Sequence, residues 1–224
     1  MKKKVLAATL AIILGLSIAA CGSSKEVVSQ KEVTAVDSET EAVKETDIIL
    51  ETETILETEN DDSNVGEIIE ENGLRKQPVI TDKELNHTGE TGPFKYSIKA
   101  IQVSKLTATN NEMAEMLEIE KDKEVTLVVM DVSIENTTDA TNYIYFDQAT
   151  LTTNTKEQVE TDWMLSDYID GEYLGSVVHE GAIFYILKNT NADELTNIKL
   201  YVDAPHDENF ETIGEEVVID LVFE

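Results

Sequence analysis

The sequence has little cysteine, proline and positive charge. Its 224 residues include one Cys, three Pro and three His, and 17 Lys and Arg stand against 46 Asp and Glu, which gives a net charge of −29. A single Cys excludes an intramolecular disulfide framework and a cysteine-based zinc site. Nucleic-acid binding needs a basic surface that releases counterions from phosphates, and so acidic a chain lacks one. We therefore expect no nucleic-acid partner.

Long apolar runs are missing too, apart from a short one at the start. Residues 5–18 are apolar and follow three lysines, a pattern too short for a stable membrane span but typical of a secretory signal peptide. Ala19 and Ala20 then precede Cys21, and this ending resembles the lipobox of bacterial lipoproteins. We predict that residues 1–20 are a signal peptide and that Cys21 receives a diacylglyceryl group. Two acyl chains would anchor the mature protein durably in the cell membrane, on its extracytoplasmic face.

An ordinary secreted protein is the alternative, but the chain's one Cys would then fall at the lipobox position by chance.

Aromatic residues are absent from the segment that follows. Residues 22–91 contain no Trp, Tyr or Phe, and acidic Glu-Thr-Glu or Glu-Thr-Asp units recur every six residues from Glu39 to Glu59. A chain so charged and so poor in aromatics cannot bury enough apolar surface to offset the entropy of ordering it. We predict a disordered, acidic, Thr/Glu-rich tether over residues 21–91.

Aromatic residues and apolar alternation begin together near Pro93, so we predict the folded domain over residues 92–224. Period-2 patterns predict strands at 94–103 (with a bulge), 124–134, 143–153, 158–163, 177–187, 197–202 and 217–223. Met113, Met116 and Leu117 have helical spacing behind Asn110 or Asn111 as cap. Trp163 lies on the same face of its predicted strand as Val159, so it is predicted to fill the interior. The expected fold is an all-β, antiparallel, immunoglobulin-like sandwich of about seven strands with one short helix.

Several short motifs in this region resemble a known family. They are Ile134-Glu135-Asn136-Thr137, Gln148-Ala149-Thr150-Leu151, Gly175 to Gly181 before Ile183-Phe184, and Pro205-His206-Asp207-Glu208-Asn209-Phe210 ahead of Ile213-Gly214. The domain resembles that of a family of Gram-positive lipoproteins with an extracytoplasmic domain of no assigned function. That domain is similar to the immunoglobulin-like domains of secreted mycobacterial immunoprotective antigens. The resemblance implies a β-sandwich behind a lipobox, and it brings no catalytic residues.

The sequence carries little that predicts catalysis. Ser176, His179 and Glu180 suggest a hydrolase fragment, but residues three apart on a strand point to opposite faces. No nucleophile elbow, phosphate loop or His-Glu-x-x-His motif occurs. We expect a protein that is not an enzyme and uses no cofactor, with His179 solvated or on an edge strand.

Two acidic loops are the candidate metal sites. Their carboxylates could wrap a hard cation, although neither loop matches the twelve-residue calcium motif, and solvated turns are the alternative. The candidate ligands are Asp167, Asp170 and Glu172 in the first loop and Asp203, Asp207 and Glu208 in the second.

Two functions remain open at this point. The first is a non-enzymatic module that binds an envelope protein or polymer, and the second is a solute- or divalent-cation-binding lipoprotein that uses the acidic loops. Aromatic residues are frequent in the loops and could serve partner recognition, although core packing explains at least half of them equally well. These residues are Tyr143, Tyr145, Phe146, Tyr168 and Tyr173.

Overall fold

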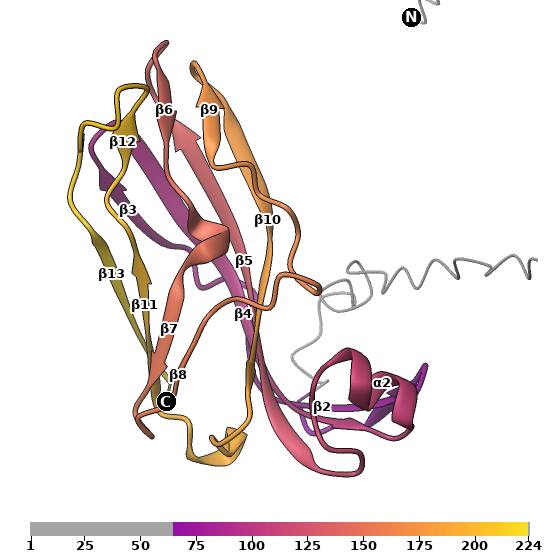
Figure 1. Cartoon of the computed structure of the whole chain (residues 1–224). Helices are drawn as coiled ribbons and strands as arrows, with labels where there is room; N and C mark the ends of the chain where they lie inside the picture. The colour runs from indigo at the N-terminus through magenta and orange to yellow at the C-terminus, as the bar shows by residue number, and fades with distance from the viewer. Residues whose placement is uncertain (1–64, 224) are drawn as a thin grey trace, which may run out of the picture. The chain divides into compact units, whose positions relative to one another are not determined.

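The computed structural model describes residues 65–223, and the predicted signal peptide, Cys21 and most of the predicted tether lie outside this range. Within it, all strand pairs are antiparallel and form three sheets (Figure 1). The six-stranded sheet holds β1 (Ile69–Glu71), β2 (Leu74–Asp82), β3 (His87–Thr91), β4 (Phe94–Ala108), β5 (Glu124–Asn136) and β10 (Val178–Leu187). The all-β sandwich is therefore confirmed.

Two smaller sheets complete the sandwich. The four-stranded sheet has the order β13 (Val217–Val222), β11 (Asn197–Val202), β7 (Thr150–Thr153), β8 (Gln158–Val159). The three-stranded sheet has the order β12 (His206–Asp207), β6 (Thr141–Tyr143), β9 (Glu172–Leu174). Short helices are α2 (Asn111–Met116), η2 (Phe146–Gln148) and η3 (Ala192–Glu194). No helix in residues 65–223 is long and apolar enough to cross a bilayer.

The main core lies between the six-stranded sheet and the two smaller ones. Alternate residues of β4, β5 and β10 point into it and are almost completely buried, among them Ile98, Met130 and Ile183. Phe94 packs its ring edge-on to Tyr173 with centroids 5.0 Å apart. The predicted bulge in the first strand is confirmed, because the β4–β5 register shifts between Ile98 and Ala100.

A second, smaller core covers part of the opposite face of the six-stranded sheet. It includes Val129 and Phe184, with Leu117 just beyond α2 packed against them. Val129 alternates with the inward-facing Val128 and Met130, and it is buried on the opposite face because α2 and nearby loops cover this half of the sheet. The predicted helix is confirmed, and its cap is Asn110, whose Oδ1 accepts a hydrogen bond of 2.8 Å from the Met113 N–H.

The folded region begins earlier than predicted. Strands β1, β2 and β3 all lie before residue 92, and β2 and β3 pair with β4 over successive parts of its length. A strand can join a sheet through its backbone with few apolar side chains, and here Val79 and Ile80 of β2 and Leu85 after it pack on the core. Aromatic content was therefore a poor marker of the boundary.

Two other predictions need correction. The segment 143–153 is not one strand, because η2 interrupts it between β6 and β7. The strand predicted at 158–163 ends at Val159. Trp163 therefore lies outside the strand, and the alternation of faces along a strand does not apply to it. Trp163 does not fill the interior and has 83% of its surface exposed.

Candidate functional site

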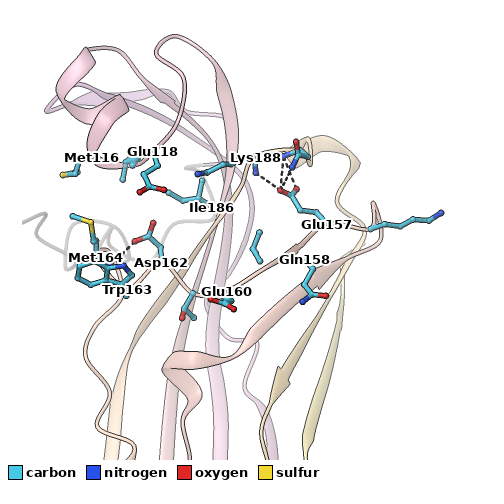
Figure 2. Close-up of a pocket in the computed structure, with 15 residues that line it drawn as sticks. Met116, Glu118, Glu157, Gln158, Glu160, Asp162, Trp163, Met164, Ile186 and Lys188 are labelled. Carbon is cyan, nitrogen blue, oxygen red and sulfur yellow. Dashed lines mark hydrogen bonds between the residues drawn. The ribbon is translucent and has the colours of Figure 1, made fainter.

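Trp163 lies at a groove of about 800 Å³ beside α2 (Figure 2). Three segments far apart in the sequence line this Trp163 groove: residues 116–118 at the end of α2, residues 156–164 around β8, and Ile186, Lys188 and Asn189 at the end of β10. Leu117 and Ile186 belong to the second core, so the base of the groove is apolar. Met164, which follows Trp163 in the sequence, also lines the groove and is 56% exposed.

A tight turn presents the indole. The Asp162 Oδ1 accepts hydrogen bonds from the backbone N–H groups of Met164 (3.0 Å) and Leu165 (3.1 Å), which is the geometry of an aspartate-nucleated turn. The Asp162 N–H donates to the Phe184 carbonyl at 2.8 Å and fastens the turn to the edge of β10. Trp163 follows directly after this anchor, so its backbone is fixed while its ring faces solvent.

Glu157 fixes the other end of the groove. Its carboxylate accepts hydrogen bonds from the backbone N–H groups of Lys188 (2.9 Å) and Asn189 (3.1 Å) and from the Thr190 hydroxyl (2.7 Å). Glu157 therefore serves the loop after β10. The other charged residues of the lining are Glu118, Glu160 and the turn residue Asp162, against Lys156 and Lys188.

The first acidic loop has its carboxylates engaged by the protein. The Asp167 Oδ2 accepts from the Ala182 N–H (2.8 Å), and the Asp170 Oδ1 accepts from the Glu172 N–H (3.0 Å). The Tyr143 hydroxyl donates to Glu172 at 2.6 Å, and this contact is the main cause that raises the pKa of Tyr143 to about 12. These acids therefore close turns and brace β6 and β9.

The second acidic loop is organised by Asp207. Its Oδ1 accepts from the backbone N–H groups of Asn209 (2.8 Å) and Glu211 (2.9 Å), and the bond from Glu211 is the first cause of its lowered pKa. Asp203 and Glu208 are exposed. In the part of the chain that the structure describes, no group of three or more His, Cys, Asp or Glu residues is placed to hold a metal ion. Neither loop's three predicted ligands form such a group.

The loop aromatics divide between core and surface. Phe146 and Tyr173 are buried, Tyr143 and Tyr145 are half-buried, and Tyr168 is 84% exposed. His179 lies on β10, at the edge of the six-stranded sheet as expected, with its Nδ1 2.7 Å from the Asp170 carbonyl and its ring stacked on Tyr173. The sequence missed the Trp163 groove because its walls come from three distant segments. Asp162 before Trp163 and Met164 was the available signal, as a turn residue that precedes two large apolar ones.

The fold is an all-β sandwich, and the chain is similar in sequence to a bacterial lipoprotein. The chain is similar to the SPbeta prophage-derived uncharacterized lipoprotein YonS of Bacillus subtilis (strain 168), with 26% identity over 168 residues, which are 74% of this chain and 74% of that protein. No family model matches the chain. Similarity to the mycobacterial antigens stays a prediction.

The chain is similar to two solved structures. A functionally unknown protein from Listeria monocytogenes EGD-e superposes with a TM-score of 0.50 at 12% identity, covering 66% of this chain and 88% of that one. A conserved hypothetical protein from Bacillus anthracis gives a TM-score of 0.38 at 12% identity, covering 65% of this chain and 99% of the other. At such identity, the Listeria protein supports the fold alone.

Proposed function

We propose that the protein is a lipid-anchored lipoprotein on the extracytoplasmic face of the cell membrane, and that its β-sandwich binds a segment of another envelope protein in the Trp163 groove. The anchor is supported by the Ala19-Ala20-Cys21 ending of the signal peptide and by the lipoprotein relative. The binding role rests on one observation: an indole that is 83% exposed is presented by a hydrogen-bonded turn at a groove whose lining includes the buried Leu117 and Ile186.

An exposed Trp on a fixed backbone is suited to anchoring a partner. Trp is enriched among the residues that dominate binding energy, because it offers a large apolar surface with few rotamers to restrict. The acidic residues of the groove lining favour a cationic partner. Glu118, Glu160 and Asp162 favour a segment that places Lys or Arg beside an apolar anchor, and a cation can also lie over the indole face.

The anchor is tested by Cys21→Ala. We expect this variant to leave the membrane fraction or to accumulate as uncleaved precursor, because the diacylglyceryl group has no other attachment point in the chain. Intact mass spectrometry of the wild-type protein should show the added lipid. An unmodified Cys21 on a cleaved mature chain would contradict the anchor without bearing on the groove.

The groove is tested by photo-cross-linking on intact cells. A photoreactive phenylalanine analogue replaces Trp163 in one strain and Tyr168, an equally exposed aromatic outside the groove lining, in the other. We expect a discrete adduct from position 163 that is absent from position 168 and is lost when Met164→Asp is added. Equal adducts at both positions, or an adduct insensitive to Met164→Asp, would refute the groove.

A further inference from the structure

A second concave site lies on the outer face of the four-stranded sheet. This cleft has a volume of about 450 Å³ and carries aromatic, amide, hydroxyl and carboxylate groups. Its lining residues are Tyr145, Gln148, Thr150, Thr152, Gln158, Tyr201, Asp203 and Glu216. None of them is cationic. Lys199, two residues before Tyr201 on the same face of β11, is in an ion pair with Asp220 at 2.8 Å.

An aromatic stack continues from the cleft over the three-stranded sheet. His206 of β12 lies 6.1 Å from the Tyr145 ring and stacks on Tyr143, its Cα partner on β6, with centroids 4.9 Å apart and planes 13° from parallel. Phe210 stacks on His206 with centroids 5.2 Å apart. Phe210 is 83% exposed, so this ring stands at the solvent end of the stack.

The backbone of Phe210 is held in an unfavourable conformation. Its φ is +62°, a left-handed value that is unfavourable for a bulky residue. The Phe210 N–H donates to the Asp207 carbonyl at 3.0 Å, and the Asp207 side chain holds the neighbouring residues. Gly or Asn would fit this position without strain. An exposed aromatic ring at a position that suits glycine has no role in packing a core.

We propose that the cleft and the Tyr143–His206–Phe210 stack form a binding site for an uncharged glycan chain. Sugar rings present C–H groups that pack on the negative faces of aromatic rings. Sugar hydroxyls both donate and accept hydrogen bonds, so they can pair with side-chain amides, carboxylates and hydroxyls. The lining of the cleft has no cation, and the chain has a net charge of −29. The cleft therefore repels phosphorylated or acidic polymers. Every side chain that lines the cleft carries a polar group, whereas the Trp163 groove also includes Leu117, Val159 and Ile186, so a glycan suits the cleft better than a protein segment.

The test uses the whole mature chain with Cys21→Ser, so that no lipid attaches. Isothermal titration with chitohexaose and with cellohexaose probes uncharged glycans, and an oligogalacturonate is the anionic control. We expect binding to at least one uncharged probe that changes little with added salt, and none to the oligogalacturonate. Phe210→Gly and Tyr201→Thr should each weaken it by about tenfold, the loss of one aromatic contact.

Matched variants separate loss of this site from loss of the fold. Phe210→Gly relieves the backbone but also removes the stack on His206, so its thermal unfolding is measured beside wild type, and an unchanged midpoint shows that lost binding is not unfolding. Val218→Thr changes the exposed neighbour of Tyr201 on β13, and Trp163→Ala changes the other groove; both should bind the glycan normally. Absence of binding to both uncharged probes, binding that salt abolishes, or binding unaffected by Phe210→Gly and Tyr201→Thr would overturn the proposal. Loss through Trp163→Ala would assign glycan binding to the groove and overturn it as well.

Discussion

The two faces of the six-stranded sheet are built differently. Its inner face is apolar over the middle of β5, with Val128, Met130, Val132 and Ile134 buried against the smaller sheets between the polar Thr126 and Asn136. Its outer face changes character along the same strand, from Val125, Leu127 and Val129 to the partly buried Asp131, Ser133 and Glu135.

This difference shows why the groove lies where it does. The inner face is covered by strands, whereas the apolar half of the outer face is covered by α2, its following loop and the turn at residues 162–166 (Figure 1). Irregular pieces of this kind leave a gap, and the Trp163 groove opens over Ile186 where the cover stops. A partner that fills this groove would complete the cover of the outer face.

The largest effect is expected from removing the strands that precede residue 92. A chain lacking residues 22–91 loses β2 and β3, and with them every partner of β4 on one side. We expect it to show no cooperative thermal unfolding by circular dichroism. A chain lacking residues 22–64, which are predicted tether, should unfold cooperatively. Equal melting of the two chains would restore the predicted domain start at residue 92.

The next effect compares the two faces with one residue type. Ile183 and Ile186 lie on the same strand and are 0% and 7% exposed, but Ile183 faces the inner core and Ile186 the groove. We expect Ile183→Ala to lower the free energy of unfolding by about 4 kcal/mol, since it leaves a closed cavity. Ile186→Ala should cost about 2 kcal/mol, the low end of the range for such truncations, because water can enter the space. Urea denaturation measures both, and equal losses would mean that the groove is closed.

Much of the inner face could be predicted, because regularly paired strands with one buried face show alternating apolar residues in the sequence. The strands at 197–202 and 217–223 and the bulge in β4 follow from that pattern. The outer face could not be predicted in the same way. Val129 is buried by a helix, and no pattern in the sequence indicates where that helix packs on the sheet. The strands before residue 92 were missed because backbone pairing needs no aromatic residue.

The candidate site was harder still to predict. The exposure of Trp163 depends on where β8 ends. Alternation continued past that end predicts a buried Trp163, which is wrong. The acidic loops were correctly seen as dense in carboxylates, but density alone does not set geometry. Asp167, Glu172 and Asp207 each bind groups of the protein itself.

A smaller effect concerns the helix that covers the outer face. The sequence left Asn110 and Asn111 open as cap, and the structure has Asn110. We expect Asn110→Ala to cost about 1 kcal/mol, since the Met113 N–H loses its partner. Asn111→Ala, at an exposed position in the first turn, should be within about 0.5 kcal/mol of wild type. The same loss from both variants would show that capping does not hold α2 in place.

The smallest effect lies on the polar half of the outer face, where two acids should respond to pH with opposite signs. Burial raises the pKa of Asp131, and nearby Lys99 offsets this only in part. The pKa of Glu180 is lowered, first by the hydrogen bond from Lys99 (2.6 Å) and then by that from the Ser133 hydroxyl (2.8 Å).

A raised pKa in the folded state means that folding favours the protonated carboxyl, so the contribution of Asp131 to stability falls as pH rises through that pKa. A lowered pKa means the reverse: Glu180 stabilises the fold above its unfolded pKa, and this contribution disappears as pH falls through the folded pKa. Asp131→Asn should therefore raise the free energy of unfolding at neutral pH by less than about 1 kcal/mol, because the group is partly exposed. Glu180→Gln should lower it, and both differences should vanish in acid. Urea denaturation from roughly pH 3 to pH 7 measures them, and two variants that shift stability in the same direction at neutral pH would show that the outer face does not distinguish its two carboxylates.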